Sequence, residues 1–214
     1  MKKWDRFYDL VLPDLPGMPP APLVDAKLRE AAITLCSKGR VHRNALDLID
    51  IRADVADYDL ETDDPRNLEV AEVREVWCDG RRLEARSAGQ LAERYGDDWR
   101  TRRGAVLFYL CHEPQVLTLV GIPDADVVAG LRVEVAFCPT LDATGVADWV
   151  FDQYALDLAT GAKSLLMAMP KKPWSDLKTA SIAAAAFQGT IDEAAFQSGR
   201  NFTRARRNTR ARFM

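Results

Sequence analysis

The residue types that most often carry chemistry are sparse in this sequence and are not grouped. His42 and His112 stand apart, and Cys111 directly precedes His112, which is not a spacing at which one helix chelates a metal ion. The one run of carboxylates comprises Asp57, Asp59, Glu61, Asp63 and Asp64. This run lacks the glycine and the final glutamate of a calcium-binding loop, and a solvated strand edge followed by a turn accounts for it. Nucleotide-binding glycine motifs and the hydrolase nucleophile motif are absent from the sequence. We therefore expect no catalytic residue, no cofactor, no metal site and no enzymatic activity.

A different kind of chemistry is concentrated at the C-terminal end, in residues 200–214. This stretch has no acidic residue and contains six arginines and two phenylalanines: Arg200, Phe202, Arg204, Arg206, Arg207, Arg210, Arg212 and Phe213. The whole chain has a net charge of −3, so removing these six positive charges leaves −9 on residues 1–199. A positive end on a negative body predicts an interaction with something anionic. A solvated chain terminus is the alternative.

The elements that must position this basic tail are helical. Apolar residues at steps of three and four predict three helices: Leu23–Lys38, Asp148–Met169 and Asp176–Ser198. Ser175 is the expected N-cap of the last one. A short loop makes the two late helices antiparallel neighbours, and the early helix is expected to pack against both. Gly161 and the block Ala183–Ala186 would let two helix axes approach closely.

Between the early and late helices the periodicity changes to that of strands. The expected strands are Ala45–Ile51, Ala56–Leu60, Val70–Cys78, Arg81–Glu84, Val106–Cys111, Gln115–Val120 and Leu131–Phe137. Asp79-Gly80 predicts a hairpin, and Ser87–Tyr95 a short helix. Runs of one element type followed by runs of the other predict an α+β fold. The predicted architecture is a helical bundle of one early helix and two long C-terminal helices, with an inserted antiparallel β region and an extended basic C-terminal tail.

The predicted organisation has four parts: a proline-rich N-terminal arm at 1–22, a helical bundle at 23–43 and 146–199, a β insertion at 44–140, and the basic tail at 200–214. Length and composition suit one domain with an insertion. No apolar run approaches the ~20 residues of a membrane span, and no signal peptide is expected. The cysteines lack paired spacing, which is typical of reduced, mostly buried residues of a cytosolic product: Cys36, Cys78, Cys111 and Cys138.

Aromatic residues in the arm and in the turn between the late helices are the second group of candidate site residues. They are Trp4, Phe7, Tyr8 and Trp174. Either the arm lies over the core of its own subunit, or its aromatics contact a neighbouring subunit. We treat these four residues as candidate subunit contacts.

Two short phrases accompany this order of parts: Leu12-Pro13-Asp14-Leu15-Pro16-Gly17 in the leader and Lys172-Pro173-Trp174-Ser175-Asp176 in the late turn. Together with the order of the parts, they resemble the head-to-tail adaptor (connector, or head-completion) proteins of tailed bacteriophages. The likeness covers most of the chain but includes no catalytic signature.

This resemblance implies a structural protein of the virion, made in the host cytoplasm and located at the head–tail junction. Such adaptors assemble as a ring, commonly of twelve copies, under the portal protein, and a tail or nozzle protein binds the opposite face. Their C-terminal segments extend onto the portal, so the arginines and phenylalanines of 200–214 would be portal-binding residues. DNA would pass through the channel without sequence-specific binding, which suits an acidic body. The alternative is a nucleic-acid-binding protein that grips DNA or RNA with the arginine-rich tail, although the acidic body counts against it.

Overall fold

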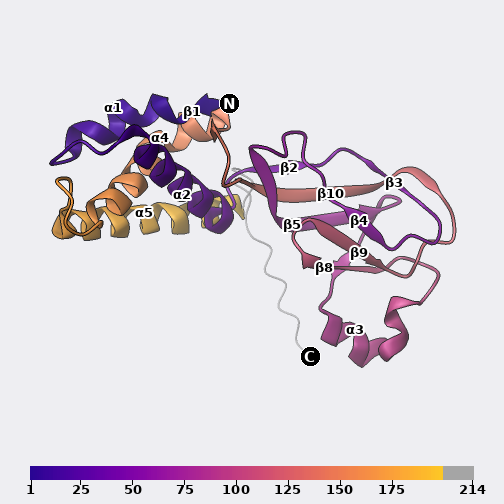
Figure 1. The fold of residues 1–214 in the computed structure, drawn as a ribbon. Helices are drawn as coiled ribbons and strands as arrows, with labels where there is room; N and C mark the ends of the chain where they lie inside the picture. The colour runs from indigo at the N-terminus through magenta and orange to yellow at the C-terminus, as the bar shows by residue number, and fades with distance from the viewer. Residues whose placement is uncertain (200–214) are drawn as a thin grey trace. The chain divides into compact units, whose positions relative to one another are not determined.

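The computed structural model describes residues 1–199, which form two compact units (Figure 1). The first, which we call the helical unit, comprises Met1–Val41 and the chain from Ala143 onward. The second, the β unit, comprises His42–Asp142. The arginine-rich segment 200–214 lies outside the described residues.

Three helices make the core of the helical unit: α2 (Ala21–Gly39), α4 (Asp148–Met167) and α5 (Leu177–Ser198). They pack against one another pairwise, and Figure 1 shows them together. The buried stripe of α2 has the spacing of one helix face: Val24, Leu28, Ala31, Ala32 and Leu35. Burial of that stripe against α4 and α5 stabilises a helix that would be marginal alone.

α4 and α5 are in close contact at Gly161. A Cβ placed there would lie 2.9 Å from ring carbons of Phe187, so only glycine leaves room for this ring. The glycine thus lets a buried aromatic of α5 pack against the backbone of α4.

The leader is held to the same unit. Strand β1 (Lys2–Lys3) pairs antiparallel with β11 (Gly145–Val146). Three short helical segments follow: η1 (Trp4–Phe7), α1 (Tyr8–Val11) and η2 (Leu12–Asp14). Because α1 contacts α4 and η1 contacts α2, the leader packs against two of the three core helices of its own chain.

The β unit contains two sheets. The five-stranded sheet has the order β2 (Arg43–Ala45), β10 (Val127–Pro139), β5 (Leu68–Cys78), β6 (Arg81–Arg82), with β3 (Ile49–Ile51) also paired to β10. The four-stranded sheet has the order β4 (Asp57–Asp59), β9 (Val116–Val120), β8 (Phe108–Glu113), β7 (Glu84–Ala85). All described pairs in these sheets are antiparallel except β7 with β8.

A shared apolar core joins the two sheets. On β10, Leu131, Val133 and Val135 are fully buried and alternate with polar residues, as the period of two requires. They pack with residues of the other sheet, such as Leu117 and Leu119. A second, smaller core lies beneath α3 (Ala88–Tyr95) and η3 (Asp97–Arg100).

Two local predictions for this unit are confirmed. Asp79 and Gly80 form the β5–β6 hairpin with φ values of 48° and 74°, the left-handed pair that a two-residue turn needs. The expected short helix is α3, and Ser87 caps it by accepting a hydrogen bond from the backbone N–H of Gln90.

The predicted fold class is wrong as an architecture. Among the described residues, five α-helices accompany three sheets, about 27% of the chain is strand, and one sheet curls into a half barrel. The chain is therefore not a helix-dominated bundle with an antiparallel insertion. The β unit has a core of its own and includes the parallel pair Glu84 with Phe108. Strands of two or three residues, such as β7 and β11, are too short to show a periodicity in sequence, so the long helices dominated the prediction.

Candidate interaction site

The predicted portal-binding residues all lie outside the described residues: Arg200, Phe202, Arg204, Arg206, Arg207, Arg210, Arg212 and Phe213. The structure does describe the helix from which they continue. α5 ends at buried Ser198, whose Oγ donates to the Ala195 carbonyl oxygen at 3.0 Å, and the Gly199 N–H donates to the same oxygen at 3.3 Å. The starting point of the basic tail is therefore set by the packing of α5 on α2 and α4.

The first two candidate aromatics are interior residues of the helical unit. Trp4 is 3% exposed, and its indole Nε1–H donates to the Ala143 carbonyl oxygen at 2.8 Å. Phe7 is fully buried and meets Phe151 edge to face, with ring centroids 4.9 Å apart. These contacts correspond to an arm that lies over the core of its own subunit.

Tyr8 is half-buried, and its hydroxyl is used inside the chain. It donates to Asp25 Oδ1 at 2.8 Å, which ties the leader to the first turns of α2. Burial, followed by the hydrogen bond to Asp25, raises the pKa of Tyr8 to about 12. The hydroxyl therefore stays protonated and keeps donating at any physiological pH.

Trp174 directly follows Pro173, the residue at which the late turn contacts the leader. We call this contact the leader–turn junction and define it by Asp14, Gly17, Lys163, Pro173 and Trp174. Lys163 Nζ forms an ion pair with the Asp14 carboxylate. A Cβ at Gly17 would lie 2.9 Å from Pro173 atoms, so the two backbones are in close contact. Trp174 is buried, and its indole Nε1 has no hydrogen-bond partner among the described residues.

The N-cap of α5 differs from the prediction. Asp176, not Ser175, occupies it, and its Oδ1 accepts hydrogen bonds from the backbone N–H groups of Lys178 and Thr179 at 3.1 Å each. Ser175 is occupied elsewhere, because its Oγ bonds the Met169 carbonyl and accepts from the N–H of Lys172. The turn therefore uses two adjacent side chains, one to close the loop and one to start the helix.

These positions answer part of the subunit-contact question. Trp4, Phe7 and Trp174 are enclosed by their own chain, which leaves little of their surface for a neighbouring subunit. Tyr8 keeps an exposed edge but has its hydroxyl engaged. In the described conformation, the aromatics anchor the leader and the turn within one subunit.

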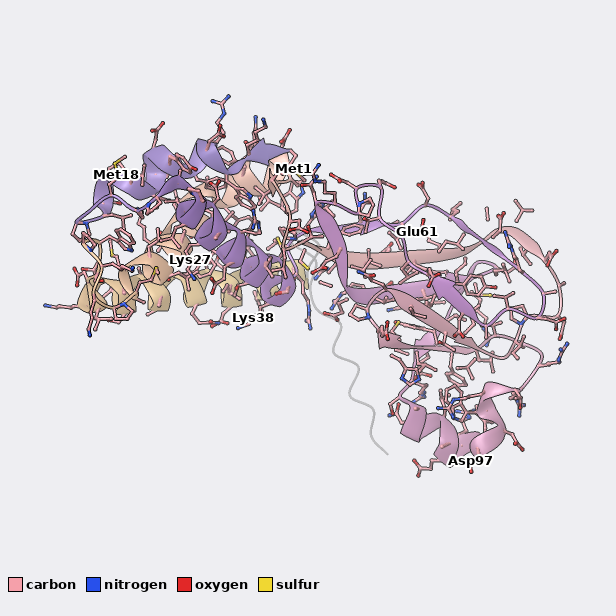
Figure 2. The ribbon with its side chains drawn as sticks, in the orientation of Figure 1. Met1, Met18, Lys27, Lys38, Glu61 and Asp97 are labelled. Atoms are coloured by element: carbon pink, nitrogen blue, oxygen red, sulfur yellow. The ribbon has the colours of Figure 1, made fainter. Side chains whose placement is uncertain are left out.

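The β unit carries an acidic hollow of about 640 Å³. Its carboxylates are Asp59, Glu61, Glu69 and Glu113, and none of its lining residues within 1–199 is a lysine or arginine. Glu61 lies at the surface of this unit, as Figure 2 shows. Such a hollow attracts cations and repels phosphates. Among residues 1–199, no group of three or more potential ligands is arranged to hold a metal ion.

The histidine and cysteine environments show no activated group. Burial of the sulfur raises the pKa of the Cys111 thiol to about 11, although the residue as a whole is exposed. Burial and the neighbouring Glu69 raise that of Cys138 to about 12. Both thiols are therefore protonated at neutral pH, whereas nucleophilic cysteines have lowered pKa values. Burial lowers the pKa of His42, so its ring is neutral near pH 7.

Sequence reasoning identified only part of the acidic hollow. The acidic run supplies Asp59 and Glu61, but Glu69 comes from β5 and Glu113 from β8. Strand pairing brings Asp59 near Glu113, since Asp59 pairs with Val116, three residues after Glu113. Glu69 belongs to the five-stranded sheet, which shares its apolar core with the four-stranded one. The sequence predicts each strand from the alternation of its apolar and polar residues. That alternation does not specify which strands become neighbours, so it could not group these four carboxylates.

No helix formed by residues 1–199 is long and apolar enough to cross a membrane. Comparison with protein-family models and with curated proteins gives no match.

Proposed function

We propose that this chain is a structural virion protein of a tailed bacteriophage. It acts as a head-to-tail adaptor that forms a ring under the portal protein, joins the DNA-filled head to the tail or nozzle protein, and lines the DNA exit channel. The observation that carries the proposal is the division of charge, −9 on residues 1–199 and +6 on residues 200–214. The basic segment continues from a packed helix and can extend about 50 Å, far enough to reach another protein.

The charge of the body suits a channel for DNA. The excess of negative charge on residues 1–199 repels the phosphates of DNA, so DNA can slide past this surface. The acidic hollow is the extreme case, because it has four carboxylates and, among the described residues, no lining lysine or arginine. The basic tail then needs an acidic partner, and an acidic groove on the portal would serve. Arginine–carboxylate contacts contribute about 1.5–3 kcal/mol each when partly buried.

The leader–turn junction supports the resemblance to adaptors at the level of residues. The two phrases that carry this resemblance lie far apart in sequence, yet Gly17 of the first contacts Pro173 of the second. Asp14 of the first phrase also pairs with Lys163, close to the turn. One packed feature therefore requires both phrases together. This support does not depend on the helical-bundle fold class, which the structure corrected.

Attachment to DNA-filled heads tests the proposal. We would compare the full chain with a chain that ends at Gly199 and with chains in which the six tail arginines are all glutamine or all lysine. The full chain should co-sediment with heads that contain the portal, and the truncated and glutamine chains should not. The lysine chain should attach more weakly than the full chain, because lysine keeps the charge but loses the two-pronged geometry of the guanidinium.

Two controls make a negative result interpretable. Circular dichroism of the truncated chain should match the full chain, because the truncation keeps all the core residues of the helical unit that the structure describes. The ratio of absorbance at 260 and 280 nm should show whether the purified full chain retains nucleic acid that high salt releases. Retention would favour the nucleic-acid-binding alternative. Attachment of the truncated chain equal to that of the full chain would overturn the proposal.

A further inference from the structure

The outward face of α5 has a regular pattern of residues that are exposed in the part of the chain that the structure describes. We call it the α5 seam and define it by Lys178, Ile182, Ala185, Gly189 and Asp192, which follow one another at steps of four and three. All five are exposed, Ile182 by 64%. The residues that α5 buries lie on the opposite side of the helix: Ala180, Phe187, Ile191 and Ala194. This 4–3 alternation is the spacing at which one helix packs along another.

Gly189 has no packing partner among residues 1–199. A Cβ at this position would meet nothing within 4 Å, whereas a Cβ at Gly161 would meet Phe187 at 2.9 Å. A helix with glycine in its interior is less stable than the same helix with alanine there, because glycine loses more backbone freedom on folding. Packing against Phe187 explains the glycine at position 161. Gly189 instead leaves a gap between the side chains on the exposed surface of α5.

We propose that the α5 seam binds the α5 seam of a second copy of this chain, antiparallel and about a two-fold axis near Ala185. In that register Ile182 lies opposite the partner's Gly189, and Ala185 lies opposite the partner's Ala186. The Ile182 side chain of each copy thus fits over the Gly189 of the other copy, once on each side of the axis. At the centre, two alanines allow the helix axes to come close. A two-fold contact requires such self-complementarity, since the same surface is used by both copies.

The charges select the same arrangement. Lys178 lies near the start of the seam, and Asp192 and Glu193 lie near its end. In the antiparallel register, Lys178 of one copy faces Asp192 and Glu193 of the other, at both ends of the contact. A parallel register would instead place like charges together. Within residues 1–199 these three side chains form no ion pair, and the two carboxylates accept hydrogen bonds only from glutamine side chains.

The contact concerns the free protein and does not rest on the proposed adaptor function. One helix from each copy gives a small interface, so the dimer should be weak and visible only in concentrated solution. Exposed ion pairs add little energy individually. Packing of the seam therefore supplies the attraction, and the charges determine the direction in which the two helices pair.

Sedimentation equilibrium of the full chain over a range of concentrations tests the charge pattern. Lys178→Glu alone, or Asp192→Lys with Glu193→Lys, should weaken dimerisation by about tenfold. The three substitutions together should restore it, because opposite charges then face each other again. All three changes suit the helix dipole, so none should unfold α5. A monomer at every concentration, or a triple variant as weak as its parents, would overturn the proposal.

Disulfide trapping tests the register. In a Cys111→Ser background, which removes an exposed native thiol, we would mix an Ile182→Cys chain with a Gly189→Cys chain. The mixed disulfide should form, and Ile182→Cys alone should not couple to itself. Ala184→Cys is the matched control, exposed on α5 but off the seam, and it should not couple. Self-coupling of Ile182→Cys would show a parallel contact and contradict the proposal, as would efficient coupling of the control.

Discussion

Gly161 and Gly189 lie in neighbouring helices, and the same substitution should have opposite effects on them. Each becomes alanine in a separate variant. Both changes gain the helix preference of alanine over glycine, about 0.5–1 kcal/mol. Only at Gly161 does the added methyl group collide with a buried ring, because its Cβ would lie 2.9 Å from Phe187.

The cost of the collision at Gly161 is the difference between the free energies of unfolding of the two alanine variants. Forcing an extra carbon into a packed core costs about 1–3 kcal/mol. Gly189→Ala should therefore stabilise the dilute protein by about 0.5–1 kcal/mol. Gly161→Ala should destabilise it, and the gap between the two variants should be about 1–3 kcal/mol, since the helix term is common to both and cancels.

Urea unfolding followed by circular dichroism at 222 nm measures the gap, because the long helices of the helical unit dominate that signal. Phe187→Leu should reduce the penalty of Gly161→Ala when the two are combined, as a double-mutant cycle would show. Equal stability of the two alanine variants would refute the packing argument for Gly161. If Gly161→Ala costs as much stability in the Phe187→Leu background as in the original protein, the added methyl group collides with a group other than Phe187.

Three further predictions concern other contacts. Trp4→Phe removes the buried hydrogen bond to the Ala143 carbonyl and should lower the free energy of unfolding by about 1 kcal/mol or more, measured by urea titration. The pKa of Asp176 is lowered from 3.8, chiefly by its hydrogen bond with the Thr179 hydroxyl. The Asp176 carboxylate therefore stabilises the folded protein fully above its unfolded-state pKa of 3.8, and this stabilisation is lost as the pH falls through the lower pKa of the folded state. Asp176→Asn should flatten the acid limb of a pH–stability curve. The Cys111 thiol, with a pKa of about 11, should alkylate at pH 8 more slowly in the folded protein than in urea, as peptide mass spectrometry would show.

The local elements were accessible from sequence wherever the signal is itself local. The helix expected at Leu23–Lys38 is present as α2, two residues longer at its start and one at its end. The Asp79-Gly80 hairpin is present because its two left-handed residues are a property of the turn alone. Such features depend on neighbours in sequence, so periodicity and turn chemistry are enough to find them.

The arrangement of strands was not accessible in the same way. β10 pairs with β2, β3 and β5, and its register with β5 shifts at Glu134 and again at Ala136. Past the second shift, Phe137 and Cys138 are both buried, so the alternation seen at Leu131 and Val133 disappears. Such bulges twist a sheet and re-aim side chains. Their positions depend on the partner strand, which no single strand specifies.

Of the candidate site, the sequence identifies charge but not burial. The charge of the basic tail and of the acidic run is a count of residue types, and it needs no fold. The role of Trp4 and Phe7 depends on burial, and both are enclosed by their own chain. An aromatic residue in a leader looks the same in sequence whether it anchors its own subunit or contacts another. Only the packing separates the two cases.

The small residues of α4 and α5 also look alike in sequence, although the structure places them in different surroundings. The sequence suggested that Gly161 and the Ala183–Ala186 block allow the two late helices to approach each other. In the structure Gly161 meets Phe187, while the last three alanines of the block are exposed. Within residues 1–199, no other helix covers those alanines, and the proposed contact assigns them to a second copy of the chain. Gly189→Ala should then raise the unfolding free energy of the dilute protein and, by filling the hole that receives Ile182, weaken self-association. Packing within one subunit cannot produce that pair of opposite signs, so measuring both quantities on this one variant distinguishes a surface that binds a second copy from a surface that is merely solvated.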